Sequence, residues 1–501
     1  MLIMADAEKV VRAVESCDLI GNHSIFSAID MNTPRSFAPM SEEYRNYLLS
    51  KPVSAIDSFI SHSWRTCGFD KKLVLVLFLH SRVASLISVL VLFTSSAIVY
   101  HRFSATPTLC QPRTIDEWLI DCVWSGGVVV GTGLTFILTL RFGQHLPFTG
   151  LTFFMDKVCI HQGDHELKNR AMQSLDLFLL YSRRMLVMWA PDYFNRLWCV
   201  YELATFLKLH PDGMKRVDFL PTWMPRFAFL TTIVLGVQMP ILGMVNTGPL
   251  LAWGMRVAGP FWGWILVHNL AVVVPAATAG GYMCYTKARR HADMIEQMRH
   301  FDTNTAICQE KSDKLFLLDL IELMWRSSEG TRDGIQQFEH YVRETLPVQL
   351  ISVVGTRTAI PYHFLVISYL CMIYVHFMFG LMCDEHMVQN WGYTSAYPEV
   401  HDRYRAFVAD WLLYCGINCF LCNSLANSVT LHVCARAMDA KMSPFLCALL
   451  TCLVYSVCLL SGIFSILVFV MWEPGSEDIL HRRVSLVAVL GTTCYLVRRS
   501  D

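Results

Sequence analysis

The sequence predicts an α/β domain with a parallel sheet, joined to an all-α region that lies in a membrane. Two observations support the membrane part. Hydrophobic residues make up 54% of the 501 residues and charged residues only 16%, which is too apolar for a soluble chain of this length. About eight segments are also apolar enough to span a hydrocarbon core of about 30 Å. The α/β part is predicted from short apolar strands that alternate with amphipathic helices.

Charge sets the expected partners and orientation. The 41 Lys and Arg balance the 41 Asp and Glu, so no net field attracts nucleic acid, and no nucleic-acid partner is expected. Most of the Lys and Arg lie in alternate segments between the apolar runs, and the positive-inside rule places these segments and the N-terminus in the cytoplasm. We therefore expect an integral, multi-pass membrane protein with membrane lipid as a partner.

Hydropathy and composition give the expected order of segments. They are an N-terminal cytoplasmic segment (1–54), a first part of the α/β domain (55–82), a transmembrane hairpin (83–140), a second part of the domain (151–221), a second hairpin (226–285), a cytoplasmic helical segment (286–358) and C-terminal transmembrane helices (360–497). The final apolar stretch is short, so about seven or eight transmembrane helices are expected. The segment 286–358 either completes the α/β domain or forms a separate helical cap.

Strand signals lie on both sides of the first hairpin. The stretch "SAIDSFISH" alternates apolar and polar residues from Ile56, "LTFFMD" is a short apolar run, and "MLVMWA" (185–190) is the kind of continuous run that a strand buried on both faces needs. A helix is expected over 166–182 and another from about Leu197. Alternating strands and helices predict a flavodoxin-like parallel sheet with right-handed crossovers, in which the chain around Ile56 pairs with the chain around Val187.

These segments resemble a TIR (Toll/interleukin-1 receptor) domain. "DSFISHSWR" is similar to the first strand and loop of that family, and "FFMDKVCIHQGDHE" to its second strand and loop. "AMQSLDLFLLYSRRMLVMWAPDYFNRLWCVYEL" is similar to the second helix, third strand and third helix. The sequence departs from the family where the hairpin intervenes, and the last TIR strands and helices have no clear counterpart before residue 226. A multi-pass membrane protein that carries such a TIR-like domain is similar to a family of proteins predicted in dinoflagellate algae.

Two distant segments of the predicted sheet converge on one crevice. In the flavodoxin-like order 2-1-3-4-5, ligands bind outside the carboxyl ends of strands 1 and 3, where the strand order reverses. A carboxylate, a guanidinium, hydroxyls and indoles are therefore expected to meet there. The candidate binding residues are Ser61, His62, Trp64 and Arg65 after the first strand and Trp198 after the third, with Glu202 one helical turn further on.

The resemblance implies a catalytic role for Glu202. In many TIR domains the glutamate of this helix carries cleavage of the nicotinamide–ribose bond of NAD, which is then a substrate, so no bound cofactor is expected. A carboxylate stabilises the oxocarbenium-like ribose that nicotinamide leaves behind. Arg65 would hold the pyrophosphate and Trp64 would stack on a base. Alternatively, Glu202 is a solvated helix-edge residue and Arg65 pairs with Asp70 or Asp156.

Many TIR domains act without catalysis. They are adaptors that signal by self-association, so the resemblance also predicts a homo-oligomer formed through the TIR-like domain. The leading interpretation is membrane-tethered signalling by such self-association, with NAD cleavage as an added activity. A transporter or channel regulated by the TIR-like domain is the alternative, in which Asp410 and Asn423 would line a path instead of bonding neighbouring helices.

Histidine and cysteine side chains near the crevice have simpler explanations than catalysis or metal binding. His62 more often caps or packs than catalyses. Cys159, His161 and His165 could suggest coordination of a metal, but no second ligand cluster has zinc spacing. Loop packing is therefore favoured for these residues, and no metal site is predicted.

Overall fold

The structure is a computed structural model and describes residues 11–22, 24–26, 40–104, 131–143, 150–223, 225–226, 256–257, 274–308, 311–326, 333–354 and 423–471. The chain divides into two compact units. Unit 1 comprises Met1–Ala84, Ile137–Arg226 and Arg289–Thr356, and unit 2 comprises Ser85–Phe136, Phe227–Ala288 and Arg357–Asp501. All the predicted crevice residues belong to unit 1.

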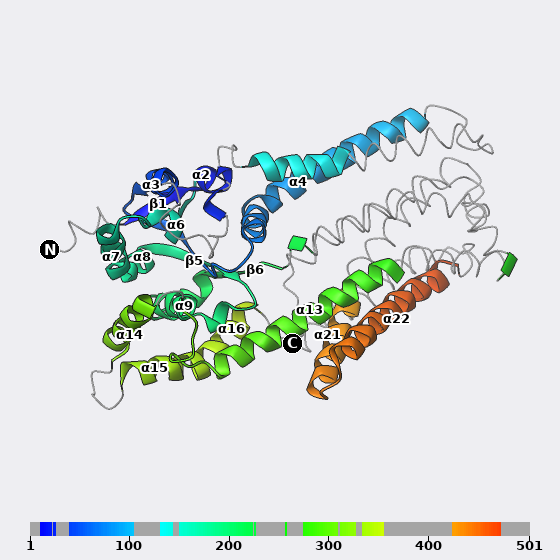
Figure 1. The fold of residues 1–501 in the computed structure, drawn as a ribbon. Coiled ribbons are helices and arrows are strands. Elements are labelled where there is room, and N and C mark those ends of the chain that lie inside the picture. The colour runs from blue at the N-terminus through cyan, green and yellow to red at the C-terminus, as the bar shows by residue number, and fades with distance from the viewer. Residues whose placement is uncertain are drawn as a thin grey trace. The chain divides into compact units, whose positions relative to one another are not determined.

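A six-stranded sheet forms the centre of unit 1 (Figure 1). Its strands, in spatial order, are β2 (Lys51–Pro52), β1 (Arg12–Glu15), β4 (Thr152–Phe154), β3 (Ile56–His62), β5 (Ser182–Trp189) and β6 (Val217–Pro221). β3 is parallel to β4 on one side and to β5 on the other, and β6 is parallel to β5. Along the chain these parallel strands therefore have the spatial order 2-1-3-4, which agrees with the predicted flavodoxin-like order.

The pairing on which the predicted crevice depends is present. In the β3–β5 pair, Ile56 lies opposite Ser182 and Ser61 lies opposite Val187. β3, which precedes the predicted hairpin 83–140, is thus a direct neighbour of β5, which follows it. The predicted pairing of the chain around Ile56 with the chain around Val187 is confirmed. β5 is buried from Met185 to Trp189, as its continuous apolar run predicts.

The sheet is mixed, whereas the sequence predicts a purely parallel one. β1 runs antiparallel to both β4 and β2, so the predicted N-terminal segment 1–54 contributes strands to the sheet. β1 has four residues and β2 has two. Such strands are too short for the alternation of apolar and polar residues to stand out in the sequence. They are recognisable only through their pairing.

One face of the sheet is covered by α8 (Leu175–Leu180) and α9 (Leu197–Leu209), which contact each other and both contact β3 and β5. The single helix predicted over 166–182 is instead α7 (His165–Gln173) followed by α8, and Ser182 already belongs to β5. Asp164 caps α7, because its side chain accepts hydrogen bonds from the first free N–H groups of that helix.

The sequence leaves open whether the segment 286–358 completes the α/β domain. Nearly all of it, Arg289–Thr356, belongs to unit 1. It contains α14 (Lys311–Trp325), α15 (Gly334–His340), a π-helical turn (Tyr341–Thr345) and α16 (Leu346–Val354). The N–H of Leu197 donates to the carbonyl of Ile307 at 3.1 Å, and Nζ of Lys208 donates to the carbonyl of Met324 at 2.6 Å. Because α9 lies between the sheet and α14, these helices extend one hydrophobic core (Figure 1).

Unit 2 is helical in its described part. It contains α21 (Asn423–Asp439), α22 (Pro444–Met471) and the first part of α13 (Val274–Arg299). Cys284 on α13, Leu431 on α21 and Cys447 on α22 share one buried cluster. A Cβ on Gly281 would lie 2.7 Å from Cα of Cys452, so glycine is required where α13 meets α22. The apolar side chains of these helices thus pack against one another.

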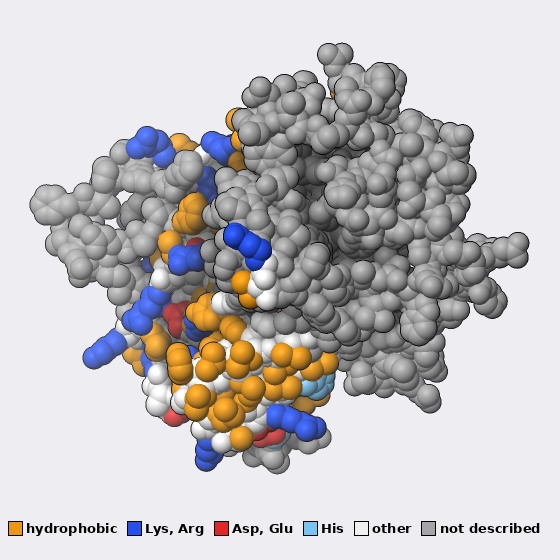
Figure 2. Space-filling view, turned by 90° about the vertical axis from the view of Figure 1, so that its right-hand side faces the viewer, with side chains coloured by type: hydrophobic (Ala, Val, Ile, Leu, Met, Phe, Trp, Pro, Cys, Tyr) orange, Lys and Arg blue, Asp and Glu red, His pale blue; other side chains and the backbone are white. Residues whose placement is uncertain are grey.

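Some apolar side chains of unit 2 remain at the surface. Along α22 the exposed ones are Phe445, Leu446, Leu449, Leu453 and Val457. Figure 2 shows hydrophobic side chains gathered on the described part of the face that it views. Nothing in the described chain indicates what contacts this patch.

No helix within the described ranges is long and apolar enough to cross a membrane. The prediction of seven or eight transmembrane helices is therefore wrong, and so is the integral membrane localisation derived from it. A helix buried in a protein and a helix buried in lipid give the same hydropathy signal, and packing within unit 2 uses apolar residues that the sequence assigned to lipid. Most of the predicted regions 226–285 and 360–497, including Asp410, lies outside the described residues.

Candidate active site at the carboxyl ends of β3 and β5

The carboxyl ends of β3 and β5 mark the place where the strand order reverses. The chain that leaves β3 re-enters the sheet at β4 on one side, whereas the chain that leaves β5 continues to β6 on the other. Ligands of open α/β sheets bind at such a position. Ser61 and His62 end β3, and Glu202 lies on α9, the helix that follows β5. The fold therefore brings these segments to one edge of the sheet.

A chain of hydrogen bonds joins Glu202 to the end of β3. The hydroxyl of Ser61 donates to Oε2 of Glu202 at 2.6 Å. The same Ser61 oxygen lies 2.6 Å from the hydroxyl of Tyr193, which also donates to the carbonyl of Cys199 at 3.2 Å. The predicted convergence of Ser61 and Glu202 is thus present in the structure.

Glu202 is a weak acid in this environment. Burial raises its pKa from 4.5 to about 8, although the hydrogen bond from Ser61 acts in the opposite direction. At neutral pH the carboxyl group is therefore mostly protonated. The protonated carboxyl can donate to Ser61, which then donates to Tyr193, whereas the ionised carboxylate accepts from Ser61. The same three side chains satisfy both protonation states by reversing their hydrogen bonds.

Asp156 holds the loop that follows β3. The indole Nε1 of Trp64 donates to Oδ2 of Asp156 at 2.6 Å, and Nε2 of His62 lies 3.9 Å from Oδ1. The rings of His62 and Trp64 are stacked, with 6.2 Å between their centroids. Burial, followed by the charge of Lys71, lowers the pKa of His62 well below 6.5, so its imidazole is neutral. His62 and Trp64 are therefore held in place at the carboxyl end of β3.

Arg65 and Trp198 are not drawn into this network. Arg65 is exposed and forms no hydrogen bond or ion pair with any described residue. The alternative partners proposed for it are occupied, since Asp70 forms a two-pronged pair with Arg226 at 2.7 and 2.8 Å and Asp156 accepts from the indole of Trp64. Trp198 is half-buried and packs against the hydrophobic core of unit 1.

Sequence reasoning missed three charged residues at this edge. Asp192 follows β5 and accepts a hydrogen bond from Ser63 at 2.9 Å. Arg196 lies 3.8 Å from Asp192, and both Arg196 and Lys71 are buried. Lys71 and Arg196 stand beside apolar helical stretches, a position that usually belongs to solvated charges. Only their burial in the folded chain distinguishes them.

The predicted loop residues Cys159 and His161 have packing roles. The thiol of Cys159 lies 3.8 Å from the carbonyl of Phe153, and burial raises its pKa to about 12. Nδ1 of His161 accepts a hydrogen bond from the N–H of Asp164 at 2.9 Å, and its ring contacts that of Tyr47. The side chain of His165 lies outside the described structure.

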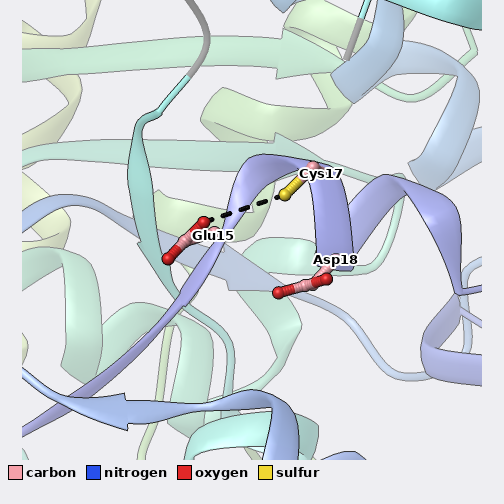
Figure 3. Close-up of side chains that lie close together, drawn as sticks. All are labelled: Glu15, Cys17 and Asp18. Atoms are coloured by element: carbon pink, nitrogen blue, oxygen red, sulfur yellow. Dashed lines mark hydrogen bonds between the residues drawn. The ribbon is translucent and has the colours of Figure 1, made fainter. Parts of the chain in front are cut away.

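A different group could be suggested as metal ligands. Figure 3 shows Glu15, Cys17 and Asp18, whose potential ligand atoms lie within 4.8 Å of one another. Glu15 is already paired with Lys51 at 3.3 Å. Burial and the charge of Asp18 raise the pKa of Cys17, so a metal ion would have to displace the thiol proton as well as the Lys51 pair. We therefore interpret this group as a hydrogen-bonded surface cluster.

Comparison with protein-family models, with curated proteins and with solved structures finds no match to this chain. The function must therefore be argued from the site itself.

Proposed function

We propose that unit 1 is a TIR-like domain that hydrolyses the nicotinamide–ribose bond of NAD at the carboxyl ends of β3 and β5. The observation that supports this best is the position of Glu202, whose carboxyl group lies 2.6 Å from Ser61 at the end of β3. Perturbed acids cluster at functional sites, and open α/β sheets bind ligands at this edge. A solvated helix-edge glutamate would keep an ordinary pKa, so that alternative is disfavoured.

The proposed reaction requires no bound cofactor. The bond between C1′ of the ribose and the ring nitrogen of nicotinamide breaks, and its electron pair leaves with neutral nicotinamide. The ribose becomes an oxocarbenium-like cation, water adds to C1′, and the added water loses one proton to Glu202 or to solvent. The positive charge of the bound nicotinamide ring favours ionised Glu202, which then stabilises the cation that develops.

The remaining residues would position this acid and enclose the substrate. Ser61 and Tyr193 orient the carboxyl group of Glu202 through their hydroxyls. His62 is neutral and Trp64 is held by Asp156, so together they present a rigid aromatic surface to a ligand. In this proposal only Glu202 acts on the reacting atoms.

Release of nicotinamide from NAD tests the proposal directly. The purified full-length protein is incubated with NAD, and nicotinamide is measured by chromatography. We expect Glu202→Gln to slow release by about 100-fold or more, because the developing cation loses its counter-charge. Glu166→Gln is the matched control, since the Glu166 side chain is 75% exposed and, among the described residues, pairs only with Arg170 on its own helix.

Two results would overturn the proposal. One is the absence of nicotinamide release by the unaltered protein, also under crowding that promotes assembly. The other is an equal rate for the Glu202→Gln and Glu166→Gln variants. Thermal unfolding of both variants shows whether a lost activity reflects chemistry or loss of the fold.

A further inference from the structure

Two positively charged side chains beside the candidate active site are buried without hydrogen bonds. Lys71 lies near the start of α4 (Gly68–Ser104) and Arg196 directly before α9, and each residue is 5% exposed. Neither the ammonium group of Lys71 nor the guanidinium group of Arg196 forms a hydrogen bond with any described residue. Buried charges are normally paired and hydrogen-bonded, whereas Arg196 has only the 3.8 Å ion pair with Asp192 and the Lys71 ammonium group has no hydrogen bond to a described residue.

The carboxylates nearby are already engaged. Asp192 accepts from the hydroxyl of Ser63 at 2.9 Å, and its oxygen stays 3.8 Å from the guanidinium nitrogen of Arg196. Asp156 accepts from the indole of Trp64 at 2.6 Å and from its neighbouring backbone N–H at 2.7 Å. These acids moderate the local charge, but they leave the N–H donors of both cations free.

Lys71 and Arg196 both influence the same neighbour, the imidazole of His62. Both Lys71 and Arg196 disfavour a proton on His62, and Lys71 also feels the charge of Arg196. The thiol of Cys199, three residues after Arg196, donates to the carbonyl of His62 at 3.5 Å. The start of α9, which carries Arg196, therefore lies against the carboxyl end of β3, and Lys71 lies in the first turn of α4, the helix that follows this strand. Two like charges that repel each other in a desolvated place are held best by an anion between them.

We infer that Lys71 and Arg196 form a binding site for the diphosphate group of a nucleotide. The planar guanidinium group suits two phosphoryl oxygens at once, and the lysine supplies a point charge. A diphosphate that joins two nucleosides carries two negative charges, which equals the charge of the pair. The inference rests on the proposed function for the identity of the ligand, NAD, and assigns its diphosphate to these buried residues instead of to the exposed Arg65.

Calorimetric titration of the full-length protein tests the site without requiring catalysis. The probes are ADP-ribose, inorganic pyrophosphate, inorganic phosphate and adenosine. We expect ADP-ribose to bind, pyrophosphate to bind more weakly, and phosphate and adenosine to bind at least tenfold more weakly than ADP-ribose. Lys71→Met and Arg196→Met should each lower the affinity for ADP-ribose at least tenfold, whereas Lys72→Met, one residue further along α4, should leave it unchanged.

Stability separates this site from a structural role. Lys71→Met removes a mostly buried charge that has no hydrogen bond to a described residue, so we expect its melting temperature to rise while its affinity for ADP-ribose falls. A lower melting temperature with unchanged affinity would show that Lys71 is structural. If the unaltered protein binds neither ADP-ribose nor pyrophosphate, the inference is overturned without any variant. If inorganic phosphate binds as tightly as ADP-ribose, the site is a simple anion site and not a diphosphate site.

The outcomes also separate this inference from the proposed reaction. ADP-ribose binding that depends on Lys71 and Arg196, without any nicotinamide release, supports the diphosphate site and removes the hydrolysis. Nicotinamide release with an unchanged KM in both variants supports the hydrolysis and removes the diphosphate site.

Discussion

Burial is the main reason why the carboxyl group of Glu202 is protonated. Desolvation is the largest effect on its pKa, and the charge of Asp156 adds a smaller one in the same direction. The hydrogen bond from Ser61 partly offsets both effects. A carboxyl group that is neutral in the resting protein and ionises when a cation arrives fits a reaction whose substrate carries a positive ring.

Glu202 should make stability depend on pH. Its pKa is higher in the folded than in the unfolded chain, so the native state holds a proton that the unfolded state releases above about 4.5. The contribution of this group to stability is therefore complete below about pH 4.5 and is lost as the pH rises towards 8. Between pH 5 and 7, urea unfolding should show the protein losing about 1 kcal/mol per pH unit relative to Glu202→Gln.

The comparison with Glu202→Gln isolates one group, because all other titrating groups are shared by the two proteins. Glu166→Gln serves as the control, and its unfolding free energy should follow that of the unaltered protein at each pH. Parallel pH profiles for the Glu202→Gln variant and the unaltered protein would show that the carboxyl group ionises normally in the fold.

The amino-acid types alone do not show which of the candidate residues lie where they could bind a substrate. Ser61 and Glu202 were predicted correctly to converge because strand ends and the following helix have fixed places in a parallel sheet. Arg65 and Lys71 are both cations after the same strand, yet the first is exposed and the second is buried. Which of them faces the crevice depends on the path of the loop and on the orientation of α4, and local sequence does not encode either.

At the scale of the elements, a close backbone contact anchors the start of α4. A Cβ on Gly68 would lie 1.6 Å from the carbonyl oxygen of Phe26 and 2.5 Å from its carbon, so only glycine fits there. The blocking atoms belong to backbone and cannot rotate away. This contact sets the position of the first turn of α4, which carries Lys71.

Gly68→Ala should therefore destabilise unit 1 by about 3 kcal/mol, because the helix start must move to accept a methyl group. Gly21→Ala is the control, since a Cβ there meets no atom within 4 Å. Urea unfolding measures both variants. If Gly68→Ala still folds, its affinity for ADP-ribose should also fall, whereas equal stability of the two variants would show that α4 is not held by this contact.

At the scale of the whole molecule, hydropathy was misleading. The apolar content of the sequence suggested helices in lipid, but none of the described helices qualifies as a span. In unit 2 apolar residues of α13, α21 and α22 pack against one another, and in unit 1 the helices after residue 288 extend the core over α9. Membrane lipid as a partner stays a prediction. Homo-oligomerisation through unit 1 stays a prediction, which the native mass of the purified protein can decide.

Local patterns in the chain are enough to predict the parallel strands β3, β4 and β5, their order, and the place of Glu202 beside Ser61. These follow from local patterns, since strand periodicity and crossover handedness leave few arrangements. The addition of β1 and β2 to the sheet, the raised pKa of Glu202, and the burial of Lys71 and Arg196 become visible only in the folded chain. Strand pairing at an edge and removal of a charge from water both depend on segments far apart in the chain, which no local pattern records.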